Sequence, residues 1–101
     1  MQIVHVVLVE WAVSTPVSHR DQARAVARSF PQRIPGVVSV VEGASVSPEQ
    51  LEGPHDYGMV ITFADADARD RYLPHAVHQE FVALLQDGAA GQITVFDIAA
   101  R

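Results

Sequence analysis

Residues 57–86 read YGMVITFADADARDRYLPHAVHQEFVALLQ, and this stretch decides the fold class. Residues 57–63 alternate large apolar side chains with other residues, which predicts a β-strand. Asp65 then predicts an N-cap for a short helix over Ala66–Tyr72. Pro74 is expected to interrupt that helix, because a proline disfavours the α conformation in the residue before it. A second helical stretch is expected from this proline to about Gln86, so the segment predicts a strand followed by a broken helix.

The residues before this segment predict a strand, a helix and another strand. Residues 2–11 are rich in Val, Ile and Leu, which favours a strand. Thr15-Pro16 predicts the start of a helix, with threonine as the N-cap and proline in the first turn. Pro31 and Pro35-Gly36 are expected to end that helix. A second strand is expected over residues 37–42.

A last strand over residues 92–98 completes the order β-α-β-β-α-β, with the second helix broken near Pro74. This order predicts an α+β, ferredoxin-like protomer with a four-stranded antiparallel sheet and helices on one face. The chain has 101 residues, which suits a single domain over residues 1–101.

Both faces of the predicted sheet are apolar. In the first strand, Val4, Val6 and Leu8 share one face, while the other face carries Ile3, His5, Val7 and Val9. Two helices cover only one face of a four-stranded sheet, and an antiparallel sheet exposes its other face to water only where that face is polar. We therefore expect a second copy of the chain to pack on the open face as a twofold homodimer.

The composition excludes several functions. The formal net charge is −5, from 7 Lys+Arg against 12 Asp+Glu, so the chain lacks the basic surface that nucleic acids or anionic membranes require. The absence of cysteine excludes disulfides, thiolate nucleophiles and cysteine-based zinc sites. The apolar segment over residues 3–9 is expected to be a strand rather than a signal peptide, and a cytoplasmic location is expected.

Two histidines lie in the second part of the broken helix. On a helical wheel from residue 74 to 86, His78 falls between Leu85 and Val82, inside the apolar stripe. His75 falls at the margin of that stripe, near the helix start, where it could help to hold an anionic ligand. A histidine in an apolar wall can be kept neutral and used as a base. The alternative is a core histidine that is satisfied by one hydrogen bond.

Tyr72 and His5 are further candidates for a pocket. Tyr72 lies before the break at Pro74, and a kink there could bring its phenol toward His78. A phenol can orient a base, or donate a hydrogen bond to a carbonyl group where negative charge develops. His5 lies on the strand face that also carries Val7, although a histidine in a dimer interface would show the same pattern.

Metal and cofactor motifs are absent from the sequence. His75 and His78 have a spacing that could bind a metal, but no HExxH or other zinc motif accompanies them. No GxSxG motif, phosphate-binding loop or GxGxxG motif occurs either. We therefore expect neither a metal nor a cofactor.

Three stretches resemble the stress-responsive dimeric α/β-barrel family. They are Ile34-Pro35-Gly36-Val37-Val38-Ser39-Val40, Tyr57 to Asp70, and Tyr72-Leu73-Pro74-His75-Ala76-Val77-His78-Gln79-Glu80-Phe81. The resemblance implies a ferredoxin-like protomer that pairs with a second copy, sheet against sheet, into a barrel. One plant member, olivetolic acid cyclase, closes a polyketide ring by an aldol-type reaction without a cofactor.

The resemblance also suggests site residues. The catalytic histidine of that cyclase matches His78, its supporting tyrosine matches Tyr72, and its pocket histidine in the first strand matches His5. Where the cyclase has a further pocket histidine, this chain has Tyr57. Between the two histidines, where the family often has proline, this chain has Ala76, so the shape of the pocket is expected to differ.

Two kinds of function follow as hypotheses. The first is a cofactor-independent enzyme, related to polyketide cyclases, that acts on a small apolar carbonyl compound. His78 would be its base and Tyr72 the partner, with His5, Tyr57 and His75 binding the substrate. The second is a non-catalytic dimer that binds a small ligand or serves as a stress-related structural protein. A cofactor-independent monooxygenase of the dimeric barrel class is a third alternative.

Overall fold

The computed structural model describes residues 1–88 and 90–100. Along these residues the elements are β1 (Ile3–Val9), α1 (Val17–Arg28), α2 (Phe30–Arg33), β2 (Val37–Gly43), β3 (Tyr57–Phe63), α3 (Ala66–Tyr72), α4 (Ala76–Asp87) and β4 (Ile93–Ala99). The strands form one antiparallel sheet in the order β2-β3-β1-β4. This confirms the predicted ferredoxin-like α+β fold, with the short α2 as an addition after the first helix.

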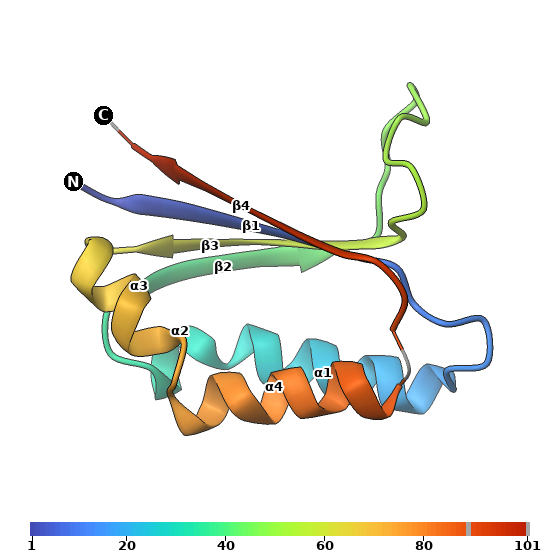
Figure 1. Cartoon of the computed structure of the whole chain (residues 1–101), viewed down its shortest axis with the longest axis horizontal. Coiled ribbons are helices and arrows are strands. Elements are labelled where there is room, and N and C mark those ends of the chain that lie inside the picture. Colours follow the sequence, from blue (N-terminus) through green and yellow to red (C-terminus); the bar gives the residue numbers. More distant parts are fainter. Residues whose placement is uncertain (89, 101) are drawn as a thin grey trace.

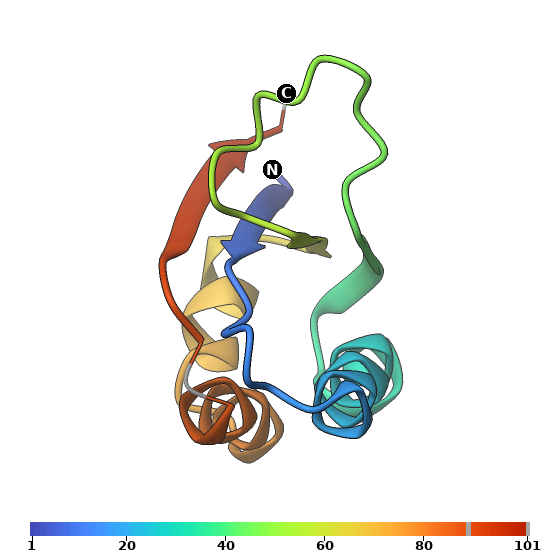
Figure 2. The same cartoon turned by 90° about the vertical axis from the view of Figure 1, so that its right-hand side faces the viewer.

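The fold has two layers, with α1 and α4 side by side on one face of the sheet (Figures 1 and 2). Alternate residues of β1 and β3 point toward these helices and are buried, as the alternation in the sequence predicts. Together with apolar residues of the helices they form one hydrophobic core; its largest fully buried side chains include Tyr72, Phe30, Phe63 and Phe81.

The predicted break between α3 and α4 is confirmed, but its expected cause is wrong. Asp65 caps α3 by accepting a hydrogen bond from the backbone N–H of Ala68 at 2.8 Å. Leu73, before the proline, keeps an α conformation with φ −56° and ψ −46°. The chain leaves the helix at His75, where ψ is 140°. Pro74 acts instead by lacking the N–H that would continue the helical hydrogen bonds.

Two expectations about the first helix are also wrong. Pro16, rather than Thr15, occupies the N-cap position, and no side chain caps α1. The Thr15 hydroxyl instead donates a hydrogen bond to the carbonyl oxygen of Gly88 at 2.5 Å. This bond connects the loop between β1 and α1 to the end of α4. Pro31 does not end the helical region, because it lies in the first turn of α2.

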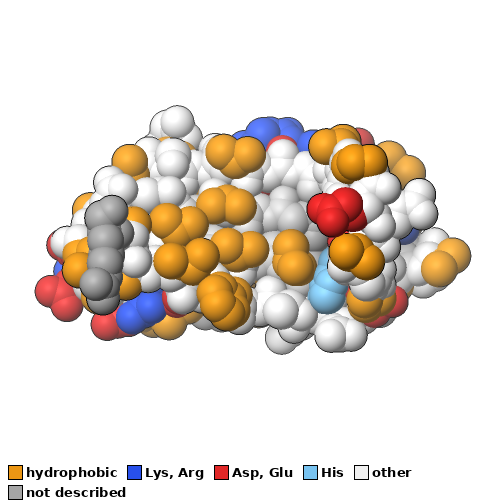
Figure 3. Space-filling model, turned by 90° about the horizontal axis from the view of Figure 1, so that it is seen from above, with side chains coloured by type: hydrophobic (Ala, Val, Ile, Leu, Met, Phe, Trp, Pro, Cys, Tyr) orange, Lys and Arg blue, Asp and Glu red, His pale blue; other side chains and the backbone are white. Residues whose placement is uncertain are grey.

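The other face of the sheet is open and apolar, as expected. Figure 3 shows hydrophobic side chains across this face. The exposed fractions are 70% for Val41, 64% for Phe96, 47% for Ile98 and 37% for Val60. Among the described residues, no helix is long and apolar enough to cross a membrane.

Candidate active site

A cavity of about 290 Å³ lies on the helix side of the sheet, bordered by α4, β1 and β4. Its volume is near the lower end of the range of about 300–1,000 Å³ that small-molecule sites occupy. The walls are mostly apolar, with side chains that include Val7, Met59, Phe81, Val82, Leu85, Ile93 and Val95. The histidines and the tyrosine among the lining residues are His5, Tyr72 and His78. The structure thus brings together three of the five predicted site residues.

The break at Pro74 determines the protonation of His78. Nδ1 of His78 lies 2.7 Å from the carbonyl oxygen of Leu73. In a continuous helix that carbonyl would accept from the N–H of Val77, but this N–H is bonded to the His75 side chain instead. Because a carbonyl oxygen only accepts, Nδ1 carries the proton, and Nε2 of the neutral ring is left with a free lone pair.

Burial keeps His78 in this neutral form. It lowers the pKa of His78 below its ordinary value, because the charged imidazolium is poorly solvated in the apolar wall. The hydrogen bond with Leu73 opposes this effect, while nearby His5 adds to it. The ring is therefore a base at neutral pH, in line with the prediction that His78 faces the apolar side of α4.

Tyr72 ends α3 and contacts the ring of His78 directly. The two ring centroids are 4.1 Å apart with an interplanar angle of 40°. The tyrosine is fully buried, and its hydroxyl has no hydrogen-bond partner among the described residues. An unsatisfied buried hydroxyl costs about 1–3 kcal/mol, so a hydrogen-bond partner that reached it would be favoured. Burial also raises the pKa of Tyr72, which keeps the hydroxyl protonated as a donor.

His5 lies at the middle of β1, opposite Asp97 of β4. Its Nδ1 is 2.5 Å from Oδ1 of Asp97, and Oδ2 of the same carboxylate accepts from Nη1 of Arg69 at 2.7 Å. Burial raises the pKa of Asp97, but the hydrogen bonds from His5 and Arg69 outweigh it and hold the pKa below its ordinary value. The carboxylate is therefore ionised and accepts the Nδ1 proton of His5.

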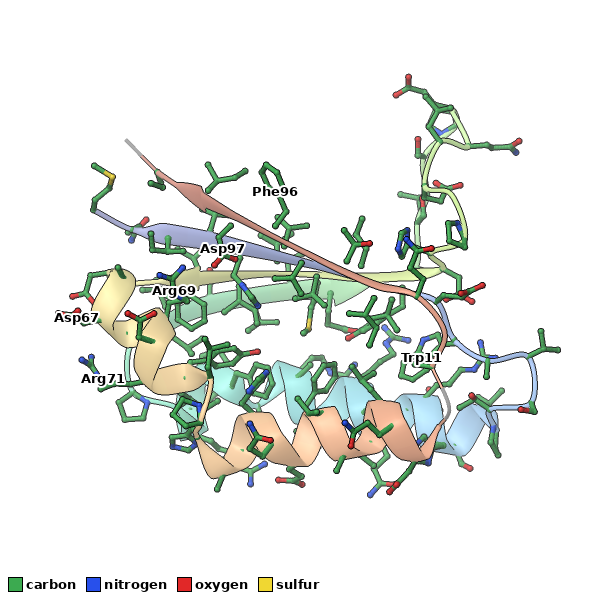
Figure 4. All side chains as sticks on the ribbon, in the orientation of Figure 1. Trp11, Asp67, Arg69, Arg71, Phe96 and Asp97 are labelled. Carbon is green, nitrogen blue, oxygen red and sulfur yellow. The ribbon has the colours of Figure 1, made fainter. Side chains whose placement is uncertain are left out.

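The prediction from sequence missed Asp97 and Arg69. The charged pattern of α3 predicts a solvated Arg69, yet its side chain points to Asp97 (Figure 4). The detectable signal is Asp97 itself, an acidic residue inside the otherwise uncharged strand ITVFDIA. An acid in such a strand is expected to have a charged partner.

His75 and Tyr57 do not line the cavity. His75 is the N-cap of α4, where its Nδ1 accepts a hydrogen bond from the N–H of Val77 at 3.1 Å. Tyr57 lies at the far end of β3 and packs against Trp11, with ring centroids 5.7 Å apart. Burial, together with nearby Glu42, raises the pKa of its hydroxyl. A substrate-binding role for these two residues stays a prediction.

The remaining histidines make structural contacts. Nε2 of His19 lies 2.6 Å from the carbonyl oxygen of Leu84, which links α1 to α4. His55 contacts the carbonyl oxygen of Glu52 at 2.9 Å and the hydroxyl of Thr94 at 3.0 Å. Within residues 1–88 and 90–100, no cluster of three His, Asp or Glu side chains could hold a metal ion.

The fold and the apolar cavity with its histidines define a ferredoxin-like barrel protomer. The sequence model of the stress-responsive A/B barrel domain matches residues 3–100, so the chain belongs to this family. No curated protein matches the chain.

Several solved structures share the fold. A dimeric ferredoxin-like protein of unknown function from Jannaschia sp. CCS1 is 25% identical, with a TM-score of 0.83 over 99% of this chain and 100% of that one. A hydroxynitrile lyase from Passiflora edulis is 14% identical, with a TM-score of 0.85 over 99% of this chain and 94% of the other. A mutant of SnoaB, a cofactor-independent oxygenase from Streptomyces nogalater, is 17% identical, with a TM-score of 0.74 over 99% and 93%. The two enzymes are too distant in sequence to indicate more than a shared fold.

Proposed function

We propose that this chain is a cofactor-independent enzyme that removes a proton from the carbon next to the carbonyl group of a small apolar compound. Nε2 of His78 takes the proton, and the electron pair of the C–H bond moves onto the carbonyl oxygen. The hydroxyl of Tyr72 has no accessible surface in this structure. Once the bound compound uncovers it, this hydroxyl donates a hydrogen bond to that oxygen and stabilises its developing charge. Return of the proton from His78 completes an exchange. Attack of the enolate carbon on a second carbonyl group would instead close a ring, as in an aldol-type polyketide cyclisation.

One observation carries this proposal. A base with a free Nε2 and a hydroxyl without a partner are in ring contact at the wall of one apolar cavity. A base and a donor for the developing oxyanion are the two groups that proton abstraction next to a carbonyl requires. The apolar walls would exclude water and strengthen both interactions.

Deuterium exchange tests the proposal. Benzyl methyl ketone in heavy water, followed by proton NMR, would lose its signals next to the carbonyl faster with the protein than without it. We expect His78→Gln to reduce the protein-dependent rate by about 10² to 10⁴-fold, the usual contribution of a general base. His55→Gln is the matched control, because His55 lies outside the cavity. A rate unchanged by His78→Gln would exclude His78 as the base.

The same assay separates the alternative functions. Binding of ketones without exchange would indicate a small-ligand binder rather than an enzyme. Consumption of oxygen with a quinol-like substrate would indicate a monooxygenase; the structurally similar SnoaB is named as a cofactor-independent oxygenase.

We also propose that the chain forms a homodimer through the open face of its sheet. Phe96 and Ile98 are exposed on that face, as are Val41 and Val60. Large contiguous apolar patches on a soluble domain mark interaction sites. The similar structure from Jannaschia is dimeric, which supports a second copy of the chain as the partner.

A further inference from the structure

The polar end of the cavity has a defined pattern of hydrogen-bond donors and acceptors. The hydroxyl of Tyr72 is a donor without a partner among the described residues. Nδ1 of His78 is bonded to the carbonyl oxygen of Leu73, and Nδ1 of His5 to the carboxylate of Asp97. Both of these partners only accept, so Nδ1 of each ring carries a proton, and in a neutral ring Nε2 is then an acceptor.

The two Nε2 atoms remain available to a ligand. Among the described residues, the buried side-chain polar atoms that lack both a partner and accessible surface are the hydroxyls of Tyr57 and Tyr72. Nε2 of His5 and Nε2 of His78 have no hydrogen-bond partner among those residues. Both histidines line the cavity, so Nε2 is the ring nitrogen that each has left for a ligand there.

No lysine or arginine side chain of the described residues is available at this end. Neither Lys nor Arg lines the cavity among the described residues. The nearest guanidinium in this network, Arg69, is already paired with Asp97 and Asp70, at 2.7 Å each. A carboxylate ligand would meet the acceptor nitrogens of neutral imidazoles and find no lysine or arginine to compensate its charge, which is unfavourable.

We propose that this cavity selects neutral molecules that carry a hydroxyl group, such as hydroxyketones, over carboxylates of the same size. The ligand's hydroxyl donates to an imidazole nitrogen, and its apolar part contacts the aliphatic walls. This inference rests on the proposed function only in taking the cavity as the binding site, and it does not require turnover.

A substitution of Asp97, the carboxylate that accepts from Arg69, provides a second, independent test of the proposal. In Asp97→Asn, the guanidinium would hold the amide oxygen, because an N–H group can donate only to that atom. The amide NH₂ would then point at Nδ1 of His5 and donate to it. The proton of His5 would move to Nε2, so that one acceptor of the cavity becomes a donor.

Binding of three compounds with a common benzyl group tests the selectivity. Benzyl hydroxymethyl ketone, benzyl methyl ketone and hydrocinnamate would be titrated by NMR at about pH 8, where an ordinary histidine is neutral. We expect the hydroxyketone to bind about tenfold more tightly than the simple ketone, the effect of one good hydrogen bond. Hydrocinnamate should bind most weakly. Equal or tighter binding of hydrocinnamate by the wild-type protein would overturn the proposal without any variant.

The Asp97→Asn variant should weaken this order of binding. We expect it to lose most of its preference for the hydroxyketone over hydrocinnamate, and nitrogen-15 NMR should show the His5 proton on Nε2. Asp67→Asn, the same change at an exposed position of α3, should behave as wild type. If the His5 proton moves and the preference is unchanged, the proposal is wrong. Ketones that bind in the predicted order without deuterium exchange would contradict the proposed enzyme but not this inference.

Discussion

Tyr72 and His78 lie on opposite sides of Pro74, in different helices, yet their ring centroids are only 4.1 Å apart. On one straight helix, residues six apart would not share a face. The break therefore creates the contact that places a hydroxyl donor beside a base. It also frees the carbonyl oxygen of Leu73 to fix the protonation of His78.

Tyr72→Phe should separate the chemistry of this contact from its packing. The ring contacts with His78 and Phe63 would remain, while a hydroxyl without a partner among the described residues would be removed. We expect the free energy of unfolding in urea to stay the same or to rise by up to about 1–3 kcal/mol, because a buried hydroxyl without a hydrogen-bond partner is removed. Deuterium exchange should fall about a hundredfold if the hydroxyl stabilises the oxyanion. A large loss of stability would show that the hydroxyl has a protein partner.

The rate of exchange should depend on pH through His78. Burial holds the pKa of His78 below the ordinary value of about 6.5, despite the opposing hydrogen bond to Leu73. The neutral ring is the active form, so the rate should rise with pH, with a midpoint below about 6.5, and level off near neutrality. A proton NMR titration of the ring should give the same midpoint. A rate that falls over this range would contradict a histidine base.

The same shift in pKa predicts a change in stability with pH. The unfolded chain binds a proton at His78 more readily than the folded chain does, so stability rises with pH between the two pKa values. The contribution is fully present above about 6.5 and is lost as pH falls through the folded pKa of His78. Urea unfolding at several pH values should show a smaller slope in this window for His78→Gln than for the wild type. Identical slopes would show that His78 titrates alike in both states.

The sequence predicts the contacts of this site between residues close together in the chain, but not those between distant segments. The inward direction of His78 follows from helical periodicity, and the contact of Tyr72 with His78 from the break at Pro74. The pair of His5 and Asp97 joins residues 92 positions apart, through the register of β1 on β4. Periodicity within one segment carries no information on such a register. For the same reason, the sequence predicts a solvated Arg69, whereas the structure pairs Arg69 with Asp97 on a distant strand.

Val60→Glu should disrupt the proposed dimer. Val60 lies on β3 in the open face and is 37% exposed in the protomer, so the folded protomer should tolerate the change. A buried charge in the centre of a dimer interface would be unpaired and costly. Light scattering at micromolar concentration should show a dimer for wild type and a monomer for Val60→Glu. Val46→Glu, in a loop where the side chain is 95% exposed, is the control and should remain dimeric. A monomeric wild type would contradict the proposal.

Gly36→Ala should destabilise the contact between α3 and the strand β2. Gly36 has a φ of +89°, and a Cβ there would lie only 2.5 Å from Cβ of Ala68. We expect a loss of about 2–4 kcal/mol from backbone strain and overpacking together. Gly53→Ala is the matched control, because Gly53 also has positive φ but a Cβ there would meet its nearest neighbour at 4.0 Å. Thermal unfolding that shows equal losses would mean that α3 moves away at no cost.

His75→Asn should keep the cap of α4, since asparagine is a good N-cap, whereas His75→Ala should cost about 1 kcal/mol of stability. If His75 only caps the helix, binding of benzyl methyl ketone by His75→Asn will equal that of wild type. Weaker binding at unchanged stability would show that His75 contacts the ligand after all, as the sequence suggests.

The proposed chemistry requires that His78 present an unprotonated Nε2 to a ligand in the cavity. Nitrogen-15 NMR of the histidine rings at about pH 8 tests it directly, because the two ring nitrogens differ strongly in shift according to which one carries the proton. We expect that Nδ1 of His78 is protonated, that Nε2 is not, and that benzyl hydroxymethyl ketone shifts the Nε2 signal. A proton on Nε2, or a signal that the ligand leaves unchanged at saturation, would contradict it.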